Sequence, residues 1–337
     1  MASIEEIAKL ANVSKMTVSN VINKKFSKVS KKTILRIEKI IEEQNYTPNL
    51  FARSLKSSES RIIILAIPQT IDNDPYKNKA FNNPFYGEII NSVEYNLRKI
   101  GYYLMFRFIG KDESLQKLII NWNIDGVIIV GAIRTEMDTI FKDINIPSVF
   151  LDSYVEDHDL DMIVIDDEEG GFLATEHLIQ SGKTKIGLVV SMLDEVGVAS
   201  KRHDGYKRAL NQYNIEYQQE RIFEGYTTND FGTEIGKKIS ENIENFDALF
   251  VYSDIMAMSV IRALKENGIK VPDDIAVVGF DGLFIGELSE PTLTTINQDI
   301  TKKGELAVDL LMKKINKEST ETEKVIMPVN LVKRKST

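Results

Sequence analysis

Residues 12–23 constrain the fold of this chain more than any other segment, because they have the two faces of a short helix. At about 3.6 residues per turn, Val18, Val21 and Ile22 fall on one apolar face, with Thr17 beside them. Ser14 stands at the N-cap position, where its hydroxyl can accept a backbone N–H group. The opposite face carries side chains suited to contact a partner, namely Lys15, Met16, Ser19, Asn20 and Asn23.

A second helical pattern directly precedes this segment. Apolar residues recur at helical spacing from Ile4 to Ala11, and Ser3 with Glu6 forms a capping box. Two short helices joined by a tight turn at 11–14 predict a helix-turn-helix, whose second helix enters the major groove of DNA. An ordinary helical hairpin is the alternative for these residues alone.

The charge distribution favours the DNA-binding alternative. Eleven Lys and Arg against five Glu give residues 1–58 a charge of +6, which leaves −14 for the remainder because the whole chain carries −8. A basic segment on an acidic body concentrates the attraction for phosphate at one end. A solvated basic surface would have the same composition, but it would not require the polar helix face in the same segment.

Two further helices are expected before residue 60. Ser30 can cap a helix that ends at Gln44, with an isoleucine stripe as its buried face. Thr47 followed by Pro48 is a second start signal, and residues 49–56 are a candidate helix too short to be stable alone in water. We therefore expect a DNA-binding headpiece over 1–47, followed by a hinge helix and linker over 48–60.

From Arg61 onward, apolar strands alternate with amphipathic helices. Continuous apolar strands of this kind predict parallel sheets with helices on both faces. About 275 residues are too many for one small core, so two lobes are expected. The predicted fold class is α/β, with an all-α headpiece and a two-lobed body of doubly wound parallel sheets. Strands are expected at 62–67, 103–108, 126–130, 148–151, 162–165, 186–190, 248–252 and 275–280.

Three aspartates, Asp152, Asp254 and Asp281, follow predicted strands. The carboxyl ends of parallel strands border the ligand crevice in open sheets, where carboxylates can accept hydrogen bonds from ligand hydroxyls. Each aspartate could instead cap the next helix, and capping is the favoured interpretation for Asp254. Arg202 opens a predicted helix as either a ligand donor or a surface charge.

Motifs for catalysis are absent from the sequence, which contains no phosphate-binding glycine loop, no His-Glu-x-x-His and no nucleophile elbow. The acidic cluster at 156–161 has no metal-loop spacing and reads as a solvated loop, so neither a metal nor a cofactor is expected. The chain has no cysteine and no run of roughly 20 apolar residues, and a signal peptide is not recognisable. We expect a cytoplasmic protein that is not an enzyme and has no membrane partner.

Several motifs together resemble the lactose- and purine-repressor family of bacterial transcriptional regulators, over essentially the whole chain. In the head, Ile4-x-x-Ile-Ala-x-x-Ala-x-Val-Ser-x-x-Thr-Val-Ser-x-Val-Ile-Asn and Tyr46-x-Pro-Asn-x-x-Ala-Arg-x-Leu match the family signature. In the body, the matching segments are 83–86, 125–128, 254–257, 279–281 and 294–298. Any one of these motifs is weak alone, and their combination is specific.

The resemblance implies a headpiece, a hinge helix and a body like periplasmic sugar-binding proteins, in a homodimer that binds a palindromic operator. The first lobe is then expected at 61–164 and 298–325, and the second at 165–297 and 326–337. Lys15, Met16 and Asn20 match base-reading positions, and Leu55 matches a leucine that wedges into the minor groove. The expected DNA contacts are Lys15, Met16, Thr17, Ser19, Asn20, Asn23, Asn49, Arg53, Leu55 and Lys56.

The resemblance also implies a small effector between the lobes. The matching positions are Phe85, Tyr86, Asp152, Arg202, Ser253, Asp254, Asp281 and Gln298. We expect a carbohydrate-operon repressor released by a sugar or sugar phosphate, because of the strand-end carboxylates and Asn83-Pro84-Phe85. A purine-type corepressor is the alternative. Some members have an effector-stacking aromatic ring where this chain has Thr227, and Tyr226 or Phe231 are the candidate substitutes.

Two other protein classes fit the sequence less well. A solute-binding protein for transport would have a signal peptide and no basic head. An enzyme on similar lobes would need a carboxylate cluster for metal or base chemistry. The leading expectation is therefore an effector-responsive repressor without a C-terminal heptad helix, which makes a dimer the expected limit of assembly.

Overall fold

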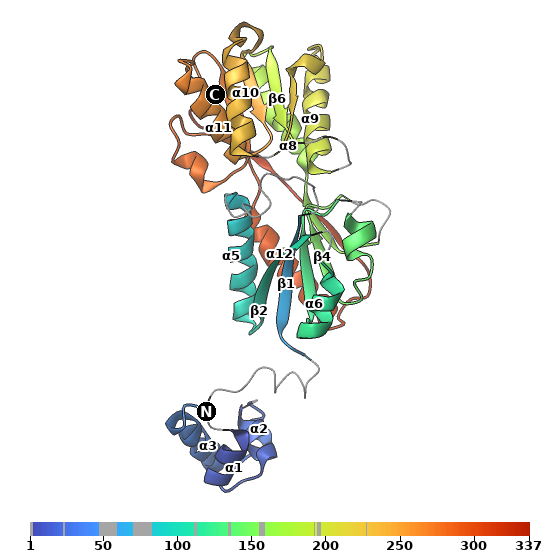
Figure 1. Ribbon diagram of the computed structural model, residues 1–337, viewed down its shortest axis with the longest axis vertical. Coiled ribbons are helices and arrows are strands. Elements are labelled where there is room, and N and C mark those ends of the chain that lie inside the picture. The colour runs from blue at the N-terminus through green and yellow to red at the C-terminus, as the bar shows by residue number, and fades with distance from the viewer. Residues whose placement is uncertain are drawn as a thin grey trace. The chain divides into compact units, whose positions relative to one another are not determined.

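The computed structural model contains two compact units, Met1–Arg61 and Ile62–Thr337. Figure 1 shows their helices and strands. The residues that the structure describes are 3–22, 24–46, 59–69, 83–110, 113–133, 136–154, 159–191, 193, 197–226 and 228–337. The expected hinge helix at 49–56 therefore lies outside the described residues, as does Thr227.

The first unit is a small helical headpiece with α1 (Ile4–Leu10), α2 (Lys15–Ile22) and α3 (Lys31–Glu43), and a 3₁₀ turn at Phe26–Lys28. The predicted capping box is confirmed, because Ser3 Oγ accepts the Glu6 N–H and the Glu6 carboxylate accepts the Ser3 N–H. These caps satisfy N–H groups that the first turn of α1 leaves without helical partners. The apolar faces of the three helices form one core, made of Ile7, Ala8, Ala11, Val18, Val21 and Ile37.

The turn between α1 and α2 has the predicted form. Asn12 adopts a left-handed φ of 49°, which an asparagine tolerates better than most residues. Ser14 Oγ accepts the Thr17 N–H at 3.1 Å and so caps α2. Ser30 caps α3, whose last helical residue is Glu43, with the expected end residue Gln44 as its C-cap.

The second unit is a two-lobed body, and its first lobe contains a six-stranded parallel sheet in the order β11-β5-β4-β3-β1-β2. Alternate residues of each strand point to opposite faces of this sheet. Ile63 and Leu65 pack with α5 and α12, whereas Ile64 and Ala66 pack with α6. The elements are β1 (Ile62–Gln69), α5 (Pro84–Lys99), β2 (Tyr103–Gly110), α6 (Leu115–Trp122), β3 (Gly126–Val130), η3 (Met137–Phe141), β4 (Ser148–Leu151), β5 (Met162–Ile165), α12 (Ile300–Ile315) and β11 (Lys324–Met327).

The second lobe has a sheet in the order β12-β10-β9-β8-β6-β7, in which only the β10–β12 pair is antiparallel. Helices α8 and α9 pack together on one face, and α10 and α11 pack together on the other (Figure 1). The elements are α8 (Asp167–Gln180), β6 (Ile186–Val190), α9 (Val198–Gln212), η4 (Gln219–Arg221), β7 (Ile222–Glu224), α10 (Asn229–Ser240), η5 (Ile243–Asn245), β8 (Ala248–Val251), α11 (Asp254–Glu266), β9 (Ala276–Asp281), η6 (Phe284–Glu287), β10 (Thr294–Asn297) and β12 (Asn330–Val332).

The strand bounds shift two of the expected lobe boundaries. Val164 and Ile165 of β5 pair with Ile326 and Met327 of β11 in the sheet of the first lobe. Boundaries after 164 and 325 would cut through both strands, so the chain changes lobes after Ile165 and after Met327. It also passes from β10 of the second lobe to α12 of the first at Gln298-Asp299.

Candidate DNA interface and effector site

Helix α2 presents the predicted polar face to solvent. Met16 is 70% exposed and Lys15 is also exposed, whereas Val18 and Val21 are buried against α1 and α3. Ser19 and Asn20 are half-buried, and the Thr17 hydroxyl lies 2.9 Å from Ser14 Oγ. The structure therefore brings five of the ten expected DNA contacts together on one short helix. The other five, Asn23, Asn49, Arg53, Leu55 and Lys56, lie outside the described residues.

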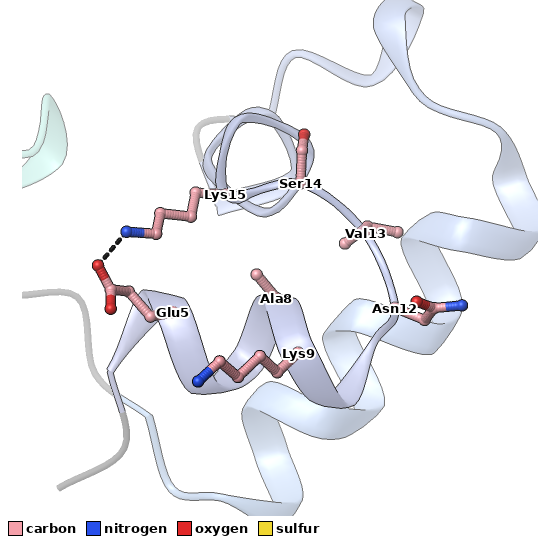
Figure 2. A pocket seen from close by; sticks show the side chains of 7 residues that line it. All are labelled: Glu5, Ala8, Lys9, Asn12, Val13, Ser14 and Lys15. Atoms are coloured by element: carbon pink, nitrogen blue, oxygen red, sulfur yellow. Dashed lines mark hydrogen bonds and ion pairs between the residues drawn. The ribbon is translucent and has the colours of Figure 1, made fainter.

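Lys15 is engaged by an acidic residue of the neighbouring helix. Its ammonium group forms an ion pair with the carboxylate of Glu5, which lowers the pKa of that carboxyl from its usual value. Figure 2 shows the two side chains reaching toward each other among the residues that line a groove. The groove is lined by Glu5, Ala8, Lys9, Asn12, Val13, Ser14 and Lys15. A base-reading role would require Lys15 to leave Glu5.

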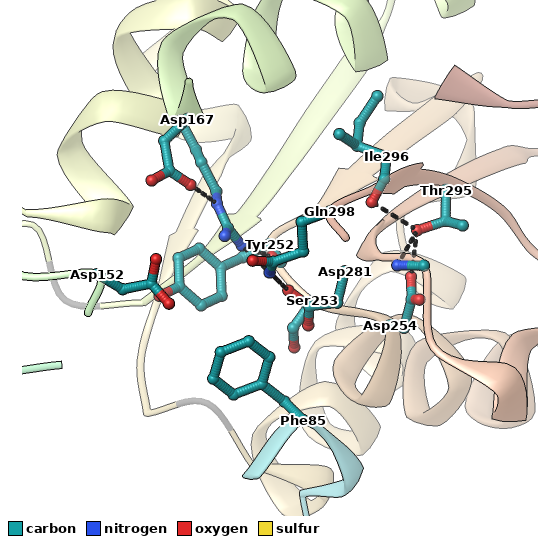
Figure 3. A network of polar contacts seen from close by, with 12 residues as sticks. Phe85, Asp152, Asp167, Tyr252, Ser253, Asp254, Asp281, Thr295, Ile296 and Gln298 are labelled. Carbon is teal, nitrogen blue, oxygen red and sulfur yellow. Dashed lines mark hydrogen bonds and ion pairs between the residues drawn. The ribbon is translucent and has the colours of Figure 1, made fainter. Parts of the chain in front are cut away.

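In the body, the polar side chains at several strand ends converge (Figure 3). Asp281 is the last residue of β9, and Gln298 follows β10 beside it. Gln298 Nε2 donates to Asp281 Oδ1 at 2.7 Å, and both side chains are buried. Asp281 and Asp152 have φ values of 116° and 51°. Residues other than glycine adopt positive φ at a cost, and such strain gathers at functional sites.

Arg202 of α9 lies beside Asp281 and is almost fully buried. Its Nε donates to Asp167 Oδ1 at 2.7 Å and its Nη1 to the Tyr252 carbonyl at 2.6 Å. The guanidinium carbon lies 3.4 Å from the centre of the Phe280 ring and 4.6 Å from that of Tyr252. These contacts identify Arg202 as an interior group, which excludes the surface-charge alternative.

Arg202 and Asp281 were both expected among the effector contacts between the lobes, and they do not come from opposite lobes. Arg202 Nη1 lies 3.8 Å from Asp281 Oδ1, but α9 and β9 both belong to the second lobe. The reason is that α9 packs against α8 over the sheet that contains β9, so its first turns reach the carboxyl edge of that same sheet.

Burial shifts the protonation of the carboxyl groups around Arg202. Desolvation raises the pKa of Asp281 to about 6, although the Arg202 guanidinium and the Gln298 amide favour its charged form. Desolvation also raises the pKa of Asp167, which accepts the Tyr154 hydroxyl at 2.5 Å. The cluster can therefore gain or lose a proton at a mildly acidic pH.

Ser253 and Asp254 are bound within the second lobe. Ser253 Oγ caps α11 through the Met256 N–H, so the prediction that Asp254 is the cap is wrong. Asp254 Oδ1 accepts the Thr295 hydroxyl at 2.6 Å, and Oδ2 accepts the Leu283 N–H at 2.7 Å. The Asp254 carboxylate thus links the β9–η6 turn to β10, because one of its oxygens accepts from each of them.

Phe85 and Tyr86 lie in the first turn of α5, which begins at Pro84, and their ring centres are 5.5 Å apart in an edge-to-face arrangement. Figure 3 shows the Phe85 ring beside the group that contains Asp152, Ser253 and Asp281. Phe85, Asp152, Arg202, Asp281 and Gln298 therefore lie in one region of the body, and Tyr86 adjoins it through its contact with Phe85. Ser253 and Asp254 are engaged within the second lobe.

Sequence reasoning missed Lys303, which is fully buried at the start of α12. Its Nζ donates to Asp152 Oδ1 at 2.6 Å, to Asp152 Oδ2 at 2.7 Å and to Gln298 Oε1 at 2.6 Å. A signal was present, since Lys303 shares one helix face with the buried Ala307, Leu310 and Leu311. A charge on an apolar face requires an interior partner.

The part of the chain that the structure describes contains no group of three or more possible metal ligands of the His, Cys, Asp and Glu types. Within the same residues, no helix has the length and apolar character needed to cross a membrane.

Comparisons with known proteins find similar sequences and structures over the whole chain. Residues 3–49 match the model for bacterial regulatory proteins of the lacI family, and residues 175–337 match a periplasmic binding protein-like domain. The chain is 34% identical over 343 residues to the HTH-type transcriptional repressor PurR of Aliivibrio salmonicida, covering 100% of this chain and 99% of the relative.

Two solved structures cover the whole chain. A Lac repressor dimer bound to operator and the anti-inducer ONPF is 26% identical, with a TM-score of 0.84 and coverage of 100% of this chain and 99% of that one. A complex of the transcriptional regulator CelR with cellobiose is 27% identical, with a TM-score of 0.74 and coverage of 100% of both chains. These similar proteins are regulators rather than enzymes.

Proposed function

This chain belongs to the lacI family of bacterial regulatory proteins, and we propose that it is a repressor of the purine type, with an uncharged nucleobase as corepressor. DNA-binding transcriptional repression itself follows from family membership. That its corepressor is a nucleobase goes beyond family membership and is supported by one observation. Lys303 already engages both carboxylate oxygens of Asp152.

The expectation of a sugar effector depended on several free carboxylates at strand ends. Asp152 accepts from Lys303, and Asp254 accepts from Thr295 and the Leu283 N–H. Asp281 Oδ1 accepts from Gln298 and lies beside the Arg202 guanidinium, so Oδ2 of Asp281 is the oxygen left for a ligand, which suits one strong donor better than a polyol with many hydroxyls. The similarity to repressors named PurR favours the same choice.

A planar ligand bound to Asp281 would also have an aromatic side chain beside it. The Phe85 ring stands beside Asp281, and aromatic pairs stack or meet edge to face with a favourable energy of about 0.5–1.5 kcal/mol. An N–H of the nucleobase would donate to the Asp281 carboxylate. Such a charge-assisted hydrogen bond is roughly twice as strong as one between neutral groups.

A thermal-shift screen tests the effector class. Hypoxanthine and guanine should raise the unfolding midpoint, whereas ribose and cellobiose should not, because a ligand stabilises the folded state to which it binds. Binding-site selection on random DNA supplies an operator, and hypoxanthine should then increase operator affinity. A midpoint raised by sugars alone would contradict the nucleobase proposal and favour the second candidate, a sugar inducer, as in the CelR complex with cellobiose.

We further propose that the repressor acts on a palindromic operator in the cytoplasm as a homodimer. Among the described residues, β2 is the last strand of the first lobe's sheet, and its Tyr103 is 53% exposed. Tyr95 and Ile100, near the end of α5, are also about half exposed. A second copy would cover this apolar edge, and light scattering should give about twice the 38.2 kDa chain mass.

A further inference from the structure

Lys303 has a complete set of partners inside the protein. An ammonium group has three N–H donors, and the three acceptors are two oxygens of Asp152 and one of Gln298. Its Nζ also lies 5.6 Å from the centre of the ring of Phe85, one of the expected effector residues. Lys303 therefore acts on an effector through its neighbours rather than by direct contact.

The first consequence concerns the orientation of the Gln298 amide. Its Oε1 accepts from Lys303, so its Nε2 is directed to Asp281, to which it donates at 2.7 Å. Asp152 and Lys303 belong to the first lobe, Gln298 lies at a passage between lobes, and Asp281 belongs to the second. The ammonium group thus determines which end of Gln298 meets the carboxylate of the other lobe.

The second consequence is a series of contacts that begins at Asp152 and returns to the same loop at Tyr154. From Asp281 it continues through Arg202 to Asp167, and Asp167 accepts the hydroxyl of Tyr154. Tyr154 follows Asp152 by two residues. Two cations and three carboxylates therefore alternate around the site, with Lys303 as the counter-ion of Asp152.

We propose that Lys303 determines effector specificity by neutralising Asp152 and fixing Gln298. With Lys303 present, Asp152 is neutralised, and Asp281, whose Oδ1 accepts from Gln298, keeps Oδ2 for the single strong donor of an uncharged ring. Without it, Asp152 becomes a second acceptor and Gln298 is free to turn over, which favours a polyol. The inference rests on the proposed nucleobase effector for its ligand class, but the ion pair can be tested without any ligand.

A double-mutant cycle in the full chain tests the ion pair. Lys303→Met keeps an unbranched apolar stem, and Asp152→Asn keeps the carboxylate shape without its charge. Each single variant should lower the thermal midpoint, because it leaves a buried charge without its partner. The midpoint of the double variant should fall by no more than half of the sum of the two single decreases. Additive losses would show that the two residues are not coupled and would overturn the proposal.

Calorimetry on the same variants tests the specificity. Lys303→Met should weaken hypoxanthine binding by tenfold or more and lower the preference for hypoxanthine over ribose by a similar factor. Lys302→Met is the matched control, since Lys302 is exposed, pairs with Glu305 and should leave both affinities unchanged. A folded Lys303→Met protein whose preference changes by less than threefold would overturn the specificity role. If the wild type failed to bind hypoxanthine while the cycle showed coupling, the nucleobase proposal would fail and the counter-ion role of Lys303 would stand.

Discussion

Arg202 Nε lies 2.7 Å from Asp167 Oδ1, although 35 residues separate them in the sequence. The contact depends on the close approach of α8 and α9, where two glycines face the partner backbone. A Cβ on Gly205 would lie 2.0 Å from the Glu168 carbonyl oxygen, and one on Gly171 would lie 2.1 Å from the Arg202 carbonyl oxygen. Because neither glycine has a Cβ, α8 and α9 can approach closely enough to hold the Arg202 guanidinium beside Asp281.

We expect Gly205→Ala to destabilise the body and weaken effector binding. The new methyl group forces α8 and α9 apart, and overpacking of this kind costs typically about 1–3 kcal/mol. Urea unfolding measures the free energy. Gly87→Ala in α5 is the control, because a Cβ at this position would have no neighbouring atom within 4 Å. It should instead raise the free energy of unfolding by about 0.5–1 kcal/mol. Equal effects of the two substitutions would contradict the close-packing explanation.

The stability of the body should depend on pH through Asp281. Burial raises its pKa to about 6 in the folded protein, above the ordinary value of 3.8. The folded state therefore holds a proton that the unfolded state releases, and stability falls as the pH rises from about 4 to 6. The effect is on the order of 2–3 kcal/mol.

Unfolding curves measured across this pH range check the dependence on Asp281. Asp281→Asn should flatten the fall in stability between pH 4 and 6, because the amide does not titrate. Asp309→Asn, at an exposed position of α12, should leave the slope as in the wild type. An unchanged slope in Asp281→Asn would assign the titration to another group, such as Asp167.

Asn20→Ala should alter the sequence preference on DNA, since an Asn amide can form two hydrogen bonds with an adenine edge. Lys31→Ala should weaken binding to all sequences alike and reduce the salt dependence, as loss of a phosphate contact does. Binding-site selection with each variant separates the two effects. The same preferences in Asn20→Ala and the wild type would remove Asn20 from the base-reading set.

Glu5→Gln should raise DNA affinity by a few fold at low salt. The ion pair with Glu5 restrains Lys15, and the substitution releases the ammonium group for contact with DNA. Glu43→Gln makes the same charge change beside Lys39 on α3 and serves as the control. Fluorescence anisotropy at several salt concentrations measures both variants. A gain of equal size in both would reflect net charge alone.

Local patterns of the sequence were sufficient for the headpiece and for the class of the body. The capping box at Ser3 and Glu6, the cap at Ser14 and the limits of α3 depend on residues within a few positions of one another. The alternation of apolar strands and helices predicted parallel sheets for the same reason, because each element buries its own apolar face. Matching segments also located most of the residues that gather around Asp281.

The tertiary structure alone decided which charges meet. Lys303 and Asp152 are 151 residues apart, and Thr295 and Asp254 are 41 apart. Hydrophobic periodicity describes only which face of an element is buried, and it does not encode which buried charge lies opposite another. A buried ion must find its partner wherever the packed elements place one, since desolvation penalises an unpaired charge by several kcal/mol. For this reason the strand-end carboxylates appeared free in the sequence, whereas the folded protein engages all three, Asp152 with Lys303, Asp254 with Thr295 and Asp281 with Gln298.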